Sequence, residues 1–309
     1  MPMNVDEEEP SAKKRKRFDP TRCPHHQTNV RKIPKVASLA PNYALGHPPS
    51  SIVAHKLGQA KLAMGFDIET HDLVERGGGG TGRFGHPWRS KSSIFHLRIV
   101  QLGWAMGGSS QEESITERAE RLVKPDGFEI SKLAIKKHGI TNEQARDEGV
   151  PLSQALEEFM CAAWSIHELQ GTVVSHHIEF DAGVIDEELH RCGMDHWRSS
   201  WRAIATRGVC TMDPDIQEWL QRAFGKEKGI GEKMLVMNLR DSIRLFYNSS
   251  PRICDLMQKS HTAGADAEMH RLHYRALRDL ALRGGSHAHA GLTWLTRYRT
   301  RIATLIAKE

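Results

Sequence analysis

Apolar and polar residues follow two different periods along this chain, which predicts a mixture of strands and helices. We expect strands where apolar residues run together or alternate with polar ones over about four to eight positions. A helix is predicted over 151–169, because its apolar residues recur at three- and four-residue spacing and Pro151 occupies its first position. The five predicted strands are 61–70, 98–104, 114–123, 171–176 and 208–212.

The remaining helical patterns lie mostly in the second half of the chain. They are 181–192, a helix that begins at Pro214, 235–247, 266–283 and a basic amphipathic helix within 291–309. Early strands followed by alternating strand and helix units predict an α/β domain.

The first 60 residues differ in composition from the rest. They are rich in proline and hold ten Lys or Arg against five acidic residues, whereas residues 61–309 hold 33 of each. We therefore expect a disordered basic tail at 1–60, which cannot bury enough apolar surface to fold, and a folded domain at 61–309. The basic run Lys13–Arg17 predicts a nuclear localisation signal for an import receptor, with an electrostatic arm for nucleic acid as the alternative.

Composition also indicates the cellular compartment in which we expect the protein. No apolar run approaches the roughly 20 residues that span a bilayer, and the N-terminus is acidic, so we expect neither a membrane protein nor a secreted one. The five cysteines are scattered and form no C-x-x-C pair, which favours a reducing intracellular compartment. With the basic run, this predicts a nuclear protein.

A glycine-rich segment, residues 72–93, follows the first predicted strand. It mixes cations with aromatic residues, and this mixture is typical of surfaces that hold phosphates and stack bases. Arg83, Trp88 and Arg89 are therefore candidate substrate contacts. The alternative is a mobile surface insertion that Trp88 anchors.

The candidate chemistry begins in Phe66-Asp67-Ile68-Glu69-Thr70. Alternate residues of a strand share a face, so Asp67 and Glu69 are expected to project together while their neighbours point the other way. Two carboxylates held this close repel each other unless a cation lies between them, and a divalent cation with oxygen ligands meets that need.

Two further acidic motifs lie far down the chain. His176-His177-Ile178-Glu179-Phe180-Asp181 follows a buried strand, and His261-Thr262-Ala263-Gly264-Ala265-Asp266 opens a helix. In order, the three motifs resemble those of the DnaQ-like 3'-5' exonucleases, the superfamily of ribonuclease T and the proofreading exonucleases. His261 stands five positions before Asp266, which resembles the DEDDh branch. One departure is His177, which stands where the family has an Asn that is not a metal ligand, so it affects substrate fit more than chemistry.

The resemblance implies a ribonuclease H-like fold, with a mixed five-stranded sheet flanked by helices and a His138-Gly139-Ile140-Thr141 turn between two helices. It also implies 3'-5' hydrolysis of phosphodiester bonds in single-stranded DNA or RNA by a mechanism that uses two Mg²⁺ or Mn²⁺ ions. The implied metal ligands are Asp67, Glu69, Asp181 and Asp266, with His261 as general base. Ile68, Thr70, His176, His177 and Phe180 are the implied pocket residues for the terminal nucleotide.

A nucleic-acid-binding module of the same fold without catalytic activity is the alternative. An inactive module would be expected to lack at least one of the metal ligands. The four ligands and the general base are all present in this sequence, which favours an enzyme. The motifs are compatible with DNA and with RNA, because that distinction depends on how a pocket treats the 2'-hydroxyl.

Overall fold

The computed structural model describes residues 51–58, 60–73, 94–108, 115–223, 239–247 and 251–283. The expected nuclear localisation signal, most of the 72–93 segment and the expected C-terminal helix lie outside these residues. The described helices are α1 (Ser51–Leu57), α2 (Lys132–His138), α3 (Asn142–Glu148), α4 (Leu152–Glu168), α5 (Ile178–Arg191), α6 (Asp195–Thr206), α7 (Pro214–Ala223), α8 (Leu239–Phe246), α9 (Pro251–Gln258) and α10 (Ala263–Arg283).

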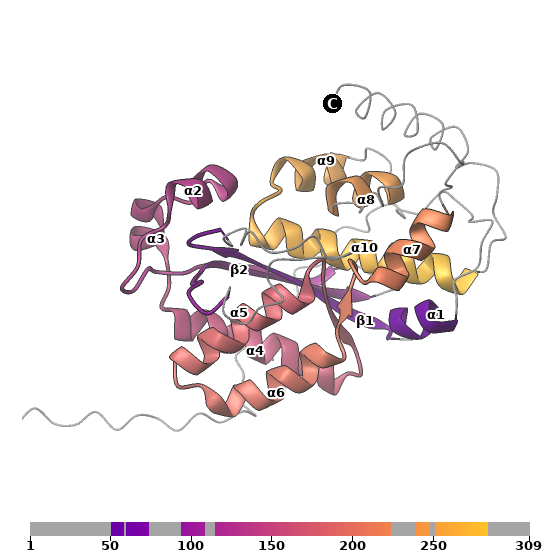
Figure 1. Cartoon of the computed structure of the whole chain (residues 1–309), viewed down its shortest axis with the longest axis horizontal. Coiled ribbons are helices and arrows are strands. Elements are labelled where there is room, and N and C mark those ends of the chain that lie inside the picture. Colours follow the sequence, from indigo (N-terminus) through magenta and orange to yellow (C-terminus); the bar gives the residue numbers. More distant parts are fainter. Residues whose placement is uncertain are drawn as a thin grey trace, which may run out of the picture. The chain divides into compact units, whose positions relative to one another are not determined.

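A mixed sheet lies at the centre of the fold (Figure 1). Its strands are β1 (Leu62–Thr70), β2 (Ile99–Gly108), β3 (Ile115–Leu122), β4 (Thr172–Ser175) and β5 (Val209–Cys210), in the order β3-β2-β1-β4-β5. β1 pairs antiparallel with β2 and β2 with β3, whereas β4 pairs parallel with both β1 and β5. The predicted α/β fold with a mixed five-stranded sheet is confirmed.

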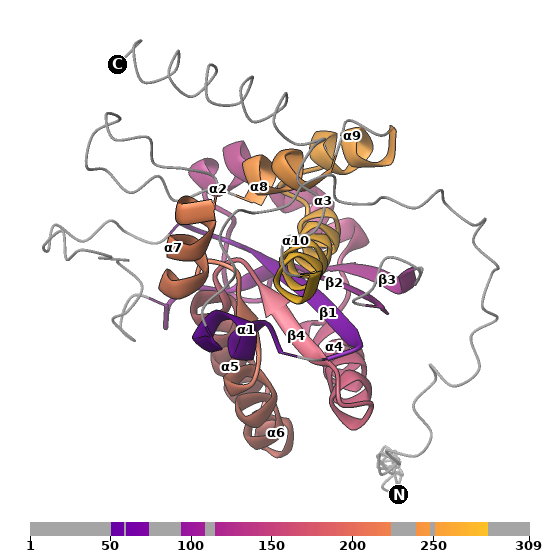
Figure 2. The same ribbon diagram turned by 90° about the vertical axis from the view of Figure 1, so that its right-hand side faces the viewer.

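Helices cover both faces of this sheet (Figure 2). On one face an aromatic cluster joins the sheet to α4 and α6: the Phe66 ring centroid lies 5.7 Å from that of Phe159 and 5.4 Å from that of Trp201. On the other face α10 packs on β1 and β2. The outer side of α10 shares a second core with α1, α7, α8 and α9, so most side chains of α10 from Ala263 to Leu280 are buried.

Two glycines allow α10 to lie directly on the sheet. A Cβ atom at Gly65 would lie 2.0 Å from the Ala267 carbonyl oxygen, and one at Gly103 would lie 2.2 Å from the Ala263 carbonyl carbon. Any larger residue at either position would push the helix away from β1 and β2. This approach brings the start of α10 close to the carboxyl-bearing part of β1.

The structure corrects the expected boundary between tail and domain. Residues 51–57 form α1, although the tail was expected to reach residue 60. Val53 and Leu57 are buried, and the Leu57 carbonyl accepts a hydrogen bond of 2.6 Å from the Tyr274 hydroxyl. Burying two such side chains contributes about 1.5 to 3 kcal/mol each, so α1 belongs to the folded unit.

Two further helices besides α1, namely α6 and α9, are absent from the sequence prediction, and α5 begins at Ile178 rather than at Asp181. The strand over 114–123 and the two helices around the His138–Thr141 turn are confirmed as β3, α2 and α3. In the described part of the chain, no helix is both long enough and apolar enough to cross a bilayer.

Candidate metal centre

The pairing of β1 with β2 sets which side chains face α10. Asp67 pairs with Gly103 and Glu69 with Gln101, and directly paired residues lie on the same face of a sheet. Gly65, Asp67 and Glu69 alternate along β1, so both carboxylates lie on the α10 face. The predicted side-by-side arrangement of these two acids follows from this register.

The third motif is held at this face by contacts from the sheet. The Gln101 side-chain oxygen accepts a hydrogen bond of 2.8 Å from the Ala263 N–H, and Glu120 accepts one of 2.8 Å from the Gly264 N–H. Both acceptors satisfy N–H groups that the first turn of a helix leaves unpaired. They fix the first turn of α10, which carries Asp266.

His261 precedes this turn in a conformation that non-glycine residues seldom adopt. Its φ is 70°, in the left-handed region, and its backbone N–H lies 3.3 and 3.2 Å from the two carboxylate oxygens of Asp266. Such a conformation costs about 1 to 3 kcal/mol and persists only where the surroundings enforce it. Here it places the imidazole over the same cavity as the Asp266 carboxylate.

The second motif comes from β4 and α5. Ser175, at the end of β4, donates a hydrogen bond from its hydroxyl to Asp181 and accepts one of 3.2 Å from the His177 N–H. Asp181 lies in the first turn of α5 and is buried. Ser175 therefore orients the third acid of the site, a role that the motif analysis does not assign to it.

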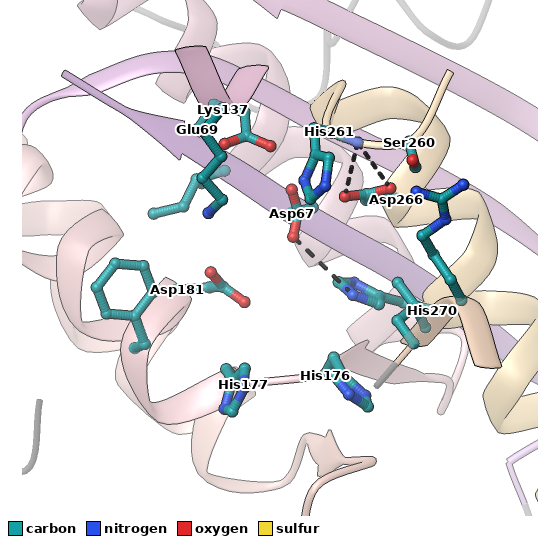
Figure 3. Close-up of a pocket in the computed structure, with 14 residues that line it drawn as sticks. Asp67, Glu69, Lys137, His176, His177, Asp181, Ser260, His261, Asp266 and His270 are labelled. Carbon is teal, nitrogen blue, oxygen red and sulfur yellow. Dashed lines mark hydrogen bonds and ion pairs between the residues drawn. The ribbon is translucent and has the colours of Figure 1, made fainter. Parts of the chain in front are cut away.

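One cavity of about 580 Å³ collects these side chains (Figure 3). Figure 3 shows the four carboxylates directed toward a common space, with His261 and His270 beside them. The expected pocket residues Ile68, His176, His177 and Phe180 line it as well. The five expected catalytic and metal-binding residues at the cavity are Asp67, Glu69, Asp181, His261 and Asp266.

Thr70 does not line this cavity, although the resemblance implies that it does. Thr70 follows Glu69 directly in β1, so strand alternation turns its side chain away from the face that carries Asp67 and Glu69. The Thr70 hydroxyl instead donates a hydrogen bond of 2.7 Å to the Asp72 carbonyl. Arg83, Trp88 and Arg89 lie outside the described residues, so their expected contacts stay predictions.

Burial dominates the electrostatics of the four acids. It raises the pKa of Asp67 well above its usual range, and the neighbouring carboxylates of Asp181, Asp266 and Glu69 raise it further. Burial likewise raises the pKa of Glu69 to about 8, that of Asp181 to about 7 and that of Asp266 to about 6. Ionised together, these groups need a positive partner in the cavity.

The donor set fits a hard divalent cation. One ligand atom from each of Glu69, His261 and Asp266 lies within 4.8 Å of the others, and carboxylate oxygens are the ligands that Mg²⁺ and Mn²⁺ prefer. Asp67 and Asp181 face the same space. A cation here would also remove the repulsion that raises these pKa values.

Two of the cavity's histidines, His261 and His270, have lowered pKa values, which favours their neutral forms near pH 7. Burial lowers the pKa of His261, and the positive charges of Lys137 and Arg240 lower it further. The His270 ring donates a hydrogen bond of 2.8 Å from Nδ1 to the Phe66 carbonyl, and burial lowers its pKa to about 4. The Nε2 atom therefore carries a lone pair instead of a proton. Nε2 lies 3.9 Å from Asp67 Oδ1.

Five cavity residues are absent from the motif analysis: Lys137, Leu239, Arg240, Ser260 and His270. Lys137 directly precedes the His138–Thr141 turn, and His270 follows Asp266 by four residues, which puts both on the same side of α10. These spacings were available as signals, whereas Arg240 has none, because α8 carries no recognised motif.

Among the comparisons with known proteins, the search of solved structures returned matches. No family model matches the chain, and no curated protein matches it. The Mg²⁺- and Mn²⁺-bound form of S. pombe Pop2p has a TM-score of 0.47 and 14% identity, over 76% of this chain and 89% of that chain. The RNase domain of the yeast Pop2 protein has a TM-score of 0.46 and 12% identity, over 77% and 84%.

A third solved structure is E. coli exonuclease I in complex with a dT13 oligonucleotide. It has a TM-score of 0.47 and 17% identity, over 73% of this chain and 42% of that chain. The present chain thus spans less than half of exonuclease I. Identities this low concern the fold alone, and the proposal below is supported by the geometry of the cavity.

Proposed function

We propose that the protein is a metal-dependent 3'-5' exonuclease that hydrolyses phosphodiester bonds of single-stranded DNA or RNA. The observation that supports this is the meeting of four carboxylates, of which Glu69 and Asp181 are buried, and one histidine, from three separate motifs, in one cavity. A binding module without activity would have no need to gather four acids in one cavity, because carboxylates held this close repel each other. The cavity fits the enzyme better than the inactive alternative.

Asp67, Glu69, Asp181 and Asp266 are the residues that would hold two Mg²⁺ or Mn²⁺ ions. Such ions, when bound, stabilise negative charge on the phosphate and lower the pKa of an attacking water. Ser175 supports this set from behind by its hydrogen bond to Asp181. Gln101 and Glu120 support it by holding the turn that carries Asp266.

His261 is the proposed general base. Its lowered pKa leaves the imidazole unprotonated near pH 7, so a ring nitrogen can accept the proton that the attacking water releases. The bond between the scissile phosphorus and the 3'-oxygen of the penultimate nucleotide breaks, and that oxygen leaves with a proton from solvent. Ile68, His176, His177 and Phe180 are proposed to position the terminal nucleotide, because they line the cavity beside the acids.

A single-stranded oligonucleotide labelled at its 5' end tests the reaction. With Mg²⁺ or Mn²⁺ we expect a ladder of labelled products that shorten from the 3' end, no ladder with chelator, and no ladder when the 3' end is chemically blocked. Asp67→Asn and Asp266→Asn serve as inactive controls, because each removes one carboxylate while keeping the side-chain shape. Internal cuts, or release of the 5' label as the first product, would contradict the proposal.

Nuclear localisation through the basic run Lys13–Arg17 is also part of the proposal. Because α1 packs on α10, the truncation that tests it should remove residues 1–50 and keep residues 51–57. The truncated protein should shift from nucleus to cytoplasm and keep its turnover on short oligonucleotides. Unchanged nuclear accumulation would remove this part of the proposal without touching the chemistry.

A further inference from the structure

Two cations, Lys137 on α2 and Arg240 on α8, line the cavity together with the four acids. Neither has an ion-pair partner within 4.0 Å in the part of the chain that the structure describes, and the Arg240 Nε is buried without a hydrogen bond. A buried guanidinium nitrogen without a partner is costly. This favours a ligand that supplies the missing acceptor.

The position of Lys137 argues against a role as the partner of any one acid. Its charge acts on all four carboxyl groups, because it lowers the pKa of each. Figure 3 shows it beside Glu69, whereas Ser260 lies on the other side, near Asp266. The charge of Arg240 lowers the pKa of Asp266 and that of His261. The two cations thus reach the acid cluster from two different helices.

Charge balance in the loaded site indicates what these cations bind. Four carboxylates carry four negative charges, which two divalent cations would cancel. Lys137 and Arg240 would then leave the cavity with about two positive charges, and each phosphodiester of a nucleic acid carries one negative charge. We propose that Lys137 and Arg240 bind two successive phosphates of the substrate, the scissile phosphate and its neighbour on the 5' side.

This inference rests on the proposed function, since it assigns further substrate-binding residues to the same cavity. Lysine binds phosphate as a compact point charge, and arginine binds it through a fork of donors. Both groups would be positioning residues for a strand that enters with its 3' end at the acids. Two phosphate contacts also suit a chain of several nucleotides better than a free mononucleotide.

Single substitutions with matched controls test the assignment. Lys137→Ala and Arg240→Ala should each raise KM about tenfold, the effect of losing one hydrogen bond to a charged group, with a smaller change in kcat. Each should also reduce the slope of log(kcat/KM) against log salt by about 0.7. Lys136→Ala, on the neighbouring position of α2, and Arg146→Ala on α3 should leave both quantities unchanged, because neither residue lines the cavity. Arg240→Lys keeps the charge and should retain the slope.

Substrates with one uncharged methylphosphonate give the second measurement. Neutralising the second phosphate from the 3' end should raise KM about tenfold for the wild-type protein. The same change should have no further effect in the variant that has lost the cation facing that phosphate. An equal penalty in the wild-type protein and in both alanine variants would overturn the assignment.

The alternative role is neutralisation of the acids without contact to substrate. In that case Lys137→Ala would tighten Mn²⁺ binding and leave the response to uncharged phosphates as in the wild type, which would also overturn the assignment. If the wild-type protein itself shortens no oligonucleotide, the proposed function fails. If it does, and the variants behave like Lys136→Ala, only the present inference fails.

Discussion

Gly103→Ala tests whether the close approach of α10 to the sheet sets the geometry of the site. The new Cβ atom would lie 2.2 Å from the Ala263 carbonyl carbon and 2.3 Å from the Gly264 nitrogen, where ordinary van der Waals contact begins at 3.4 Å. Relief of this overlap requires a movement of about 1 Å, and both contacts are backbone, so no flexible side chain can absorb it. His261 and Asp266 flank the two contacted residues and would move with them.

The expected magnitudes separate stability from chemistry. Overpacking of this kind costs about 1 to 3 kcal/mol of unfolding free energy, and a displacement of about 1 Å at a reacting group can cost about a hundredfold in rate. We therefore expect a folded protein, with a melting temperature lower by a few degrees, whose kcat falls about a hundredfold. Steady-state degradation of a single-stranded oligonucleotide and a thermal unfolding curve measure the two effects.

Gly193→Ala is the matched control. Gly193 has a φ of 65° and open space where a Cβ would lie, so alanine there costs about 1 to 2 kcal/mol of strain. It lies two residues beyond α5, whose last residue, Arg191, is about 15 Å along the helix from Asp181 at a rise of 1.5 Å per residue. It should lower stability and spare kcat. Wild-type kcat in Gly103→Ala, or an equal loss of kcat in Gly193→Ala, would refute the reasoning.

Three further predictions concern the acids, the base and the glycine-rich segment. His261→Ala should lower turnover about a hundredfold or more while the protein still binds single strands. Fluorescence anisotropy with a labelled oligonucleotide measures that binding. Lost binding together with normal turnover at saturating substrate would show that His261 is not the general base. In the presence of chelator, the free energy of unfolding, measured by urea denaturation, should fall as pH rises from 6.5 to 8. In the folded protein the pKa values of Glu69 and Asp181 are about 8 and 7, whereas in the unfolded chain both carboxyl groups are already ionised in this range. The fall is at most about 1.4 kcal/mol per pH unit for each group, Mg²⁺ should abolish it, and a flat curve in chelator would contradict the burial of these acids. Trp88→Ala with Arg89→Ala should weaken oligonucleotide affinity and spare chemistry, and unchanged affinity for every length tested would make the segment a plain insertion.

The lower limit of that pH window follows from the buried histidines. Burial lowers the pKa of His270 to about 4 and that of His273 to about 3. A group with a lowered pKa in the folded state adds stability as pH rises toward its unfolded value near 6.5. Above pH 6.5 these histidines are neutral in both states, so the slope reports the carboxylates.

The acids could be predicted from the sequence because their geometry is local. Strand alternation places Asp67 and Glu69 on one face, and a short strand that runs into a helix places Asp181 near that helix's first turn. Thr70 is expected at the pocket only from the family resemblance, whereas strand alternation places its side chain on the face opposite Asp67 and Glu69.

The residues that sequence analysis misses owe their positions to tertiary packing. Lys137 and Arg240 lie on the short helices α2 and α8, which meet the cavity through tertiary packing, and no motif near Arg240 marks the acids as its partners. α1 lies in a proline-rich region whose composition is typical of a disordered tail. Val53 and Leu57 are nevertheless buried in a hydrophobic cluster that includes residues of α10. α6 carries helical spacing at Trp197, Trp201 and Ile204, so there the signal was present in the sequence.

Direct measurement of Mn²⁺ binding tests the central claim, that carboxylates from three motifs form one metal centre. Electron paramagnetic resonance of the full-length protein, titrated with Mn²⁺ in the presence of a single-stranded oligonucleotide, counts bound ions. We expect two Mn²⁺ per chain for the wild-type protein and fewer for Asp67→Asn and for Asp181→Asn. No bound Mn²⁺, or the same number in both variants as in the wild type, would contradict the account.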